Sequence, residues 1–422
     1  MTSTQAAPAR SKPRQRGSIR PHRSGFQIRV TAGVDSATGE RIVLCETAST
    51  EREAEKIRTR LLAQADALTT ARSKASFGYL LDAWFPNHDV GPSTKVTYES
   101  LIRNHIRPAL GTVPLTKLHR TAAKMLEDFY GELRRCSRRC GGRLLIDHRV
   151  GGPHDCVLHD CRTHKCRPLA ASSVRQVHAV ISGALSAAVR WGWLPFNPAE
   201  AVDPPAKQRP DPQPPTPADA ARLIEEAWQQ DEQWGLYLWL AMVLGARRGE
   251  LVALRWKHVD FDTSFITIRR NYVRAGGEGY DKDTKGHQMR RLNVDQPTLD
   301  LMESRRKTCA DLLALGGTEL RPDHLVFSAS PDLLKPRDPS SMTRRYKRLA
   351  TKLGIDSHLH ELRHYSATEL LTAGVDLRTV AGRLGHGDGT TTLRHYAAWV
   401  TKADEQAAGI ISARLPRPRS AS

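Results

Sequence analysis

The sequence predicts a multidomain protein with a small N-terminal β-sheet plus helix module, an all-α bundle and a mixed, mainly-α α+β domain. Three observations predict this fold class. Apolar residues alternate over a short stretch near the N-terminus, and they follow helical spacing from residue 76 to about 197. Seven prolines then stand among the fifteen residues 203–217, which is typical of an extended linker. A chain of 422 residues also exceeds what one core usually organises.

The N-terminal module is predicted from a change of period along the chain. Phe26, Ile28 and Val30 alternate with polar residues, as in a half-buried strand. A turn and a second strand follow, and Ser49–Thr50 then form a cap for a helix that we expect to end near Ala67. Strands followed by one helix make a compact sheet-plus-helix module.

The next region is predicted to be a helical bundle. Helices are expected at Phe77–Trp84, after a cap at Ser93–Thr94, at Ala123–Leu133 and at Ser172–Trp191, because their apolar residues repeat at helical spacing. Most of these apolar faces are expected to form the core.

The last domain is predicted to mix helices with a few strands. A strongly apolar helix is expected at Leu236–Leu244, followed by a strand in which Ile266 and Ile268 alternate outward. A turn at Thr284–Gly286 and a strand at Leu292–Val294 come next, and further helices close the chain. The predicted divisions are a disordered basic tail at 1–16, the first module at 17–70, the bundle at 71–202 with a Cys/His-rich insertion at 134–168, the linker at 203–217 and the last domain at 218–422.

The charge of the chain points to a polyanionic partner. Lys and Arg number 64 against 45 Asp and Glu, a formal net charge of +19. Nucleic acid is the leading candidate and an anionic membrane surface the alternative. We find no apolar run of 18 residues and no secretory signal, so a cytoplasmic protein without membrane association is expected. The basic tail is either a solvated segment or an arm that touches DNA.

Four short segments of the last domain concentrate basic and nucleophilic residues. In chain order they are Gly245–Leu251 with Arg247 and Glu250, the turn with Lys285, His360–His364 with His360 and Arg363, and Leu384–His386 followed ten residues later by Tyr396. Glu250 lies within one helical turn of Arg247. His360 and Arg363 are three residues apart, so we expect them to share one helix face.

Together, these segments resemble the tyrosine recombinase (phage integrase) family. The match covers about 150 residues and keeps the order of the family's motifs. The resemblance implies that 17–70 is an arm-type DNA-binding module, that 71–202 is a core-binding domain and that 218–422 is the catalytic domain. One departure is a loop before Tyr396, containing Gly387–Gly389, that is one residue longer than usual; glycine makes such an insertion tolerable.

The resemblance also implies roles for these residues. Arg247 and Arg363 would hold the non-bridging oxygens of a phosphodiester, where charge accumulates during attack. Tyr396 would be the nucleophile and form a 3′-phosphotyrosine. A tyrosine hydroxyl has a pKa of about 10, so it needs a base, and His360 is the candidate.

The remaining roles concern proton transfer and support. Lys285 is the candidate acid for the leaving 5′-oxygen, His386 would donate to the phosphate, and Glu250 would orient its neighbours. Two rivals remain on the sequence alone: Lys282 lies close to Lys285, and Tyr365 is a second candidate nucleophile, although its place one turn from His360 favours packing.

The resemblance further implies a site-specific integrase that integrates or excises a mobile element such as a phage. Its partners would be double-stranded DNA attachment sites, three further copies of the chain in a homotetramer, and directionality or DNA-bending factors. The apolar stretch 403–411 would dock on a neighbouring subunit. Neither ATP nor a catalytic metal is expected, because the phosphotyrosine conserves the bond energy and the sequence has no phosphate-binding Gly-Lys-Ser/Thr loop.

Five of the seven cysteines fall in the insertion, among several histidines. Thiolates and imidazoles at short spacing are suited to tetrahedral zinc, with ligands expected from Cys136, Cys140, Cys156, Cys161 and Cys166 plus a histidine. The alternative is a basic surface loop with incidental cysteines. Cys45 and Cys309 are expected to be ordinary small apolar residues.

Three other functions are each compatible with part of these features. A non-enzymatic DNA-binding regulator would have the charge and the N-terminal module but no use for the four ordered segments. A zinc-dependent hydrolase or nuclease would be expected to have a His-Glu-x-x-His helix, which the sequence lacks. A type IB topoisomerase shares the chemistry, and the arm-like N-terminus with Leu384–His386 favours the recombinase.

Overall fold

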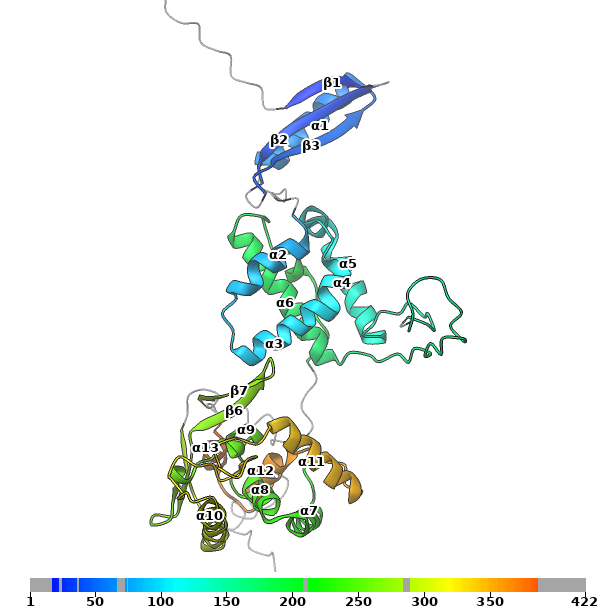
Figure 1. Ribbon diagram of the computed structural model, residues 1–422. Coiled ribbons are helices and arrows are strands. Elements are labelled where there is room, and N and C mark those ends of the chain that lie inside the picture. Colours follow the sequence, from blue (N-terminus) through cyan, green and yellow to red (C-terminus); the bar gives the residue numbers. More distant parts are fainter. Residues whose placement is uncertain are drawn as a thin grey trace, which may run out of the picture. The chain divides into compact units, whose positions relative to one another are not determined.

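The structure is a computed structural model that describes residues 17–22, 25–35, 38–66, 73, 75–146, 148–207, 212–283 and 289–385 (Figure 1). The chain divides into two compact units, Met1–Gln208 and Arg209–Ser422, and each has hydrophobic clusters of its own. Within the described ranges, no helix has the length and hydropathy to cross a bilayer. The predicted tail 1–16 and the predicted docking segment 403–411 lie outside these ranges.

The first part of the N-terminal unit is a three-stranded antiparallel sheet with one helix. The strands β1 (Ser18–His22), β2 (Gly25–Val34) and β3 (Arg41–Ala48) pair in chain order, and α1 (Glu51–Asp66) packs against them (Figure 1). Ile28 and Val30 are buried under the helix, as the alternation predicts.

The predicted cap of α1 is present. The backbone N–H of Glu53 donates to Thr50 Oγ1 at 3.3 Å, and Glu53 Oε2 accepts from the N–H of Ser49 at 3.2 Å. One detail of this module differs from expectation. Cys45 lies exposed on β3 instead of serving as a small apolar core residue, whereas Cys309 in the second unit is buried.

The rest of the N-terminal unit is a helical bundle around one core. Its elements are α2 (Phe77–Trp84), η1 (Phe85–Asn87), α3 (Pro92–Leu101), the π-helical turn η2 (Ile102–Ile106), α4 (Arg107–Leu110), α5 (Leu115–Arg135), α6 (Ala171–Arg190) and η3 (Pro198–Ala201). The side chain of Ser76 caps α2 by accepting from the N–H of Tyr79.

Two helix starts in the bundle differ from the predictions. α3 begins at Pro92 with Gly91 as its cap, so Ser93–Thr94 lie inside the helix; proline is well suited to this first turn because it has no N–H to leave unpaired. α5 begins at Leu115 rather than Ala123, and its first turns bury Leu115 against the same core as its later ones.

The C-terminal unit combines helices with two small sheets. Its helices are α7 (Pro217–Gln230), α8 (Glu232–Val243), α9 (Arg248–Val252), η4 (Trp256–His258), α10 (Gln296–Leu315), α11 (Pro339–Lys352), α12 (Glu361–Thr372) and α13 (Leu377–Leu384). The strands β4 (Val259–Asp260), β5 (Phe265–Ile268) and β8 (Arg290–Asn293) form one antiparallel sheet, and β6 (Arg270–Ala275) pairs with β7 (Glu278–Asp283).

The strands of this unit differ from the prediction in two ways. Ile266 and Ile268 do not face outward: both are buried, because β5 is the central strand and turns its apolar face to the helices. Between β5 and β8 the chain also forms the hairpin β6–β7, which was not predicted. Its turn is Gly276–Gly277, and both residues have positive φ, as a tight hairpin turn requires.

Candidate active site

Arg247 lies where α8 ends and the short α9 begins. The preceding Gly245 has a φ of +56°, and a Cβ on it would lie 2.6 Å from Leu384 Cδ2, so this tight turn requires glycine. Arg247 follows in an extended conformation as the cap residue of α9, and its side chain is 26% exposed. The break between two helices therefore presents this arginine at the surface of the unit.

Beneath Arg247 lies Glu250, a buried carboxylate held by two arginines. Its oxygens accept from the backbone N–H and Nη1 of Arg247, each at 2.9 Å, and from Nη1 and Nη2 of Arg290 at 3.2 and 2.6 Å. Burial raises the pKa of Glu250, but the hydrogen bonds and charges of Arg290 and Arg247 outweigh burial and lower the pKa to about 2. The carboxylate is therefore ionised at neutral pH, and the cluster keeps one positive charge in excess.

The sequence analysis did not single out Arg290, the first residue of β8. Its side chain is 4% exposed and forms a forked pair with Glu250. A Cβ on Gly385 would lie 2.6 Å from both Cδ and Nη1 of Arg290, so this arginine packs against the glycine before His386. The alternation of residues in β8 could have predicted that Arg290 is buried, because Arg290 and the buried Leu292 lie on the same face of the strand.

Arg363 ties three of the predicted segments together. It lies on α12 and is buried. Its Nη1 donates to the carbonyl oxygen of Gly245 and its Nη2 to that of Leu384. The first of these carbonyls lies two residues before Arg247, and the second lies two residues before His386. One guanidinium group therefore fixes the turns that lead to two other candidate residues.

His360 and Arg363, which we expect to share a helix face, differ in burial. α12 begins at Glu361, so His360 is the cap residue, and its side chain is exposed whereas that of Arg363 is buried. The imidazole ring of His360 instead meets that of His364 edge to face, with 5.1 Å between the ring centroids. His360 therefore lies exposed at the N-terminus of α12.

The remaining candidates divide between described and undescribed residues. Tyr365 packs partly buried against the core, and burial raises its pKa, which agrees with a packing role. Lys282 lies on β7 opposite Asn271. The candidates Lys285, His386 and Tyr396 lie outside the described residues, as does the glycine-containing loop before Tyr396.

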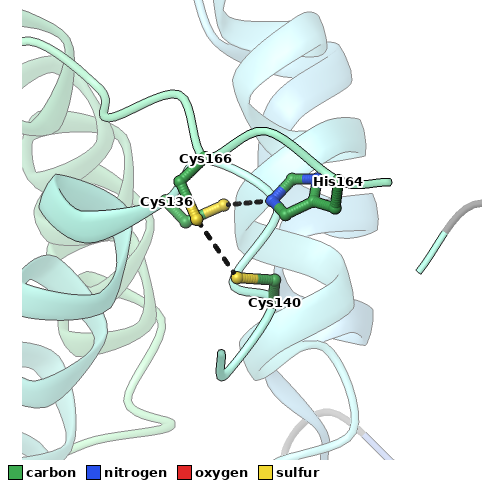
Figure 2. A group of neighbouring side chains, drawn as sticks. All are labelled: Cys136, Cys140, His164 and Cys166. Atoms are coloured by element: carbon green, nitrogen blue, oxygen red, sulfur yellow. Dashed lines mark hydrogen bonds between the residues drawn. The ribbon is translucent and has the colours of Figure 1, made fainter. Parts of the chain in front are cut away.

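The Cys/His insertion lies between α5 and α6 and corrects the predicted ligand set. The five cysteines do not converge on one site. The structure instead forms two groups, Cys136–Cys140–His164–Cys166 (Figure 2) and His148–His154–Cys156–Cys161. Within each group all four ligand atoms lie within 4.8 Å of one another. Cys156, Cys161 and Cys166 follow one another at intervals of five residues, but Cys166 belongs to a different group from the other two.

Two segments of the chain match models of known protein families. Residues 216–402 match the model of the phage integrase family, and residues 76–124 match that of the phage integrase N-terminal SAM-like domain. The chain belongs to the phage integrase family. The two matches together cover more than half of the chain and include the predicted positions of all seven candidate residues.

Individual members of the family show the same likeness. The prophage integrase IntR of Escherichia coli is 26% identical over 251 residues, which are 56% of this chain and 60% of IntR. The chain therefore matches less than two thirds of that relative's length.

Two solved structures extend the likeness in fold. The Tn1549 transposon integrase in complex with transposon right end DNA aligns with a TM-score of 0.58 and 16% identity, over 79% of this chain and 99% of that one. A lambda integrase tetramer bound to a Holliday junction aligns with a TM-score of 0.50 and 17% identity, over 92% and 96%. At these identities the likeness is one of fold, and it confirms the predicted multidomain class.

Proposed function

We propose that the chain is a site-specific tyrosine recombinase, an integrase that cuts and rejoins DNA through Tyr396 and so integrates or excises a mobile element. The observation that carries this proposal is the position of Arg363. Its bonds to Gly245 and Leu384 draw the segments of Arg247, Arg363 and His386 together. A site with a partly exposed guanidinium group, that of Arg247, and a net positive charge suits a phosphodiester substrate.

In the proposed reaction the hydroxyl oxygen of Tyr396 attacks a backbone phosphorus of duplex DNA. The bond from phosphorus to the 5′-oxygen breaks, and a 3′-phosphotyrosine forms. Arg247 and Arg363 stabilise the negative charge that grows on the non-bridging oxygens, which removes the need for a catalytic metal. The 5′-hydroxyl of a second strand then attacks the phosphotyrosine, so the DNA backbone is restored without ATP.

Each step also moves a proton. His360 accepts the proton of the Tyr396 hydroxyl, and its exposed position at the start of α12 leaves it accessible to the reacting group. Lys285 gives a proton to the leaving 5′-oxygen, and His386 donates to the phosphate. Glu250 and Arg290 are positioning residues: their buried pair fixes the backbone and guanidinium of Arg247.

The proposed partners follow from the family. The chain would bind two double-stranded attachment sites in the cytoplasm as a homotetramer, with the bundle and the catalytic domain on opposite faces of the duplex and the proline-rich linker between them. Tetramer formation is supported by the lambda integrase structure, which is a tetramer on a Holliday junction. Directionality or DNA-bending factors would bind alongside, and 403–411 would dock on a neighbouring subunit, so its deletion should disrupt the synaptic tetramer.

A trapping experiment tests the proposed chemistry. The protein is incubated with a pool of duplexes of randomised sequence, each with one nick, so that cleavage beside the nick releases a short fragment and leaves the protein attached. We expect an adduct that survives detergent and forms in the presence of a chelator. It should be absent in Tyr396→Phe and retained in the control Tyr365→Phe. An adduct that persists in Tyr396→Phe contradicts the assignment of the nucleophile.

The same experiment separates the rival functions. A DNA-binding regulator would give no covalent adduct with any duplex. A zinc-dependent nuclease would give cleaved but unattached DNA, and only without chelator. A type IB topoisomerase would form the adduct but rejoin only the original strand. The recombinase is expected to join strands from two captured duplexes, which sequencing of the products detects.

A further inference from the structure

The Cys/His insertion is a long segment without regular secondary structure or an apolar core in its described residues. Between the end of α5 and the start of α6, the described residues form turns and bends but no helix or strand. Its apolar side chains do not form a core: Leu144, Val157 and Leu158 are exposed. A segment of this length needs some other interaction to offset the entropy lost in holding one conformation.

The two Cys/His groups are nested along the chain. Cys136 and Cys140 come first, and His164 and Cys166 come last, so the first group closes the neck of the insertion. The second group uses only residues between them and closes its tip. Backbone bonds support the neck: the N–H of Ser137 donates to the carbonyl of Arg167 at 2.8 Å, and that of Leu169 to the carbonyl of Leu133 at 2.9 Å.

The distances in the neck group are close to those of a tetrahedral site. Zinc binds sulfur at about 2.3 Å and imidazole nitrogen at about 2.0 Å, so ligand atoms around one ion stand roughly 3.3–3.8 Å apart. Cys140 Sγ lies 3.5 Å from Cys166 Sγ, within this range, and Cys136 Sγ lies 3.1 Å from His164 Nε2, slightly below it (Figure 2). Figure 2 shows the three thiols and the imidazole nitrogen pointing toward one another.

The tip group has a similar geometry and a supporting contact. His154 Nε2 lies 3.3 Å from Cys161 Sγ, and His148 Nδ1 lies 3.4 Å from Cys156 Sγ. His154 Nδ1 is 2.8 Å from the carbonyl oxygen of Gly152. This nitrogen must carry the proton to donate to a carbonyl, which leaves the lone pair on Nε2 for a metal. The backbone N–H of Arg149 also points to Cys161 Sγ at 3.5 Å, as is common for a metal-bound thiolate.

We propose that the insertion binds two structural Zn²⁺ ions, one through Cys136, Cys140, His164 and Cys166 and one through His148, His154, Cys156 and Cys161. Each ion would have four protein ligands and no open position, which is typical of structural zinc. The five thiols would release their protons when the metal binds. Because the insertion has no apolar core of its own, it would fold only with metal. This proposal is independent of DNA cleavage, because it concerns a segment without any of the residues assigned to the reaction.

Metal analysis of variants tests the number of ions and their separation. We expect the full chain, purified without chelator, to hold two zinc ions by inductively coupled plasma mass spectrometry. Cys140→Ser and Cys161→Ser should each hold one, and the double variant none. The matched control His159→Ala removes a histidine of the same insertion that belongs to neither group, and it should keep both ions. One or no zinc per wild-type chain after reconstitution, iron instead of zinc, or loss of both ions in both single variants would overturn the proposal.

A measurement on the wild-type chain avoids variants that fail to fold. Maleimide labelling mapped by mass spectrometry should leave all five insertion cysteines unmodified, and a strong chelator should make them reactive. Cys166 gives the clearest test of the neck site, because its thiol is exposed and yet should be protected from maleimide by the metal. Cys45, which is also exposed and lies on β3, should react with and without chelator. Labelling of Cys166 before chelation would refute the neck site, and the covalent DNA adduct reports separately on the recombinase reaction.

Discussion

Glu250 and Arg290 form an ion pair that is removed from water almost completely, with side chains 1% and 4% exposed. Such a pair gains little net stability over an apolar substitute, but removing one partner leaves an unpaired buried charge. Arg247 shares the same carboxylate and remains partly exposed. The buried pair therefore holds Arg247 in one orientation, which its proposed role in binding phosphate requires.

Glu250→Gln is expected to destabilise the C-terminal unit in a pH-dependent way. Because the folded state lowers the pKa of Glu250 from 4.5 to about 2, its contribution is complete above pH 4.5 and disappears as the pH falls toward 2. The loss at pH 7 should be on the order of 3 kcal/mol. Calorimetry of the full chain from pH 7 to pH 3 should show the two proteins converging at low pH. Asp356→Asn, at an exposed carboxylate, is the control, and equal melting of Glu250→Gln and wild type at pH 7 would contradict the assignment.

The proposed acid role of Lys285 has a chemical test. If Lys285 protonates the leaving 5′-oxygen, Lys285→Ala should slow cleavage by about 10²–10⁴-fold. A substrate with sulfur in place of that oxygen leaves as a thiolate and needs no acid, so it should restore the rate. Lys282→Ala is the matched control from the same region and should cleave both substrates normally. Full rescue of Lys282→Ala but not of Lys285→Ala would exchange the two assignments.

At the scale of elements, the end of α13 depends on a glycine. Gly385 has a φ of +68°, and its α-carbon faces Arg290 without room for a side chain. Arg383, two residues before it, donates to the carbonyls of Asn293 and Val243 and so fastens the helix to β8 and α8. These contacts fix the direction in which the chain leaves α13 toward His386.

Gly385→Ala and Gly382→Ala should therefore have opposite effects. Alanine at 385 adds a left-handed strain of about 1–2 kcal/mol and displaces Arg290, so both melting temperature and adduct formation should fall. Alanine at 382 lies within α13 with no atom within 4 Å of its Cβ, so it should stabilise the helix by about 1 kcal/mol and leave the chemistry unchanged. Melting curves and the trapping assay measure both, and similar losses in the two variants would argue against a special role for Gly385.

At the scale of the whole molecule, the charge of +19 should govern DNA affinity. Each phosphate neutralised by Lys or Arg contributes a slope of about −0.9 to the logarithm of the binding constant against the logarithm of salt concentration. Deletion of residues 1–66 removes the tail and the first sheet module, so the slope should become shallower if this region contacts DNA. Fluorescence anisotropy with a duplex at several salt concentrations gives both slopes, and identical slopes would show that this region does not bind DNA. Adduct formation on a short duplex should persist in the deletion.

The fold class and the order of the candidate segments follow from the sequence alone. These are local properties: periodicity, caps and short motifs are all read within a few residues, and helices such as α2 and α6 begin and end near the expected positions. The identity of Lys285, His386 and Tyr396 as candidates still rests on the sequence.

Which groups meet in space depends on the packing of the folded chain. It placed Arg290 under Glu250, 40 residues away in the chain, and it brought the carbonyls of Gly245 and Leu384 to Arg363. It also left His360 exposed while Arg363 is buried, and it divided one cysteine series into two Cys/His groups. The physical reason is the same in each case: hydrogen bonds and coordination select partners by distance, and distances between residues far apart in the sequence are set by packing.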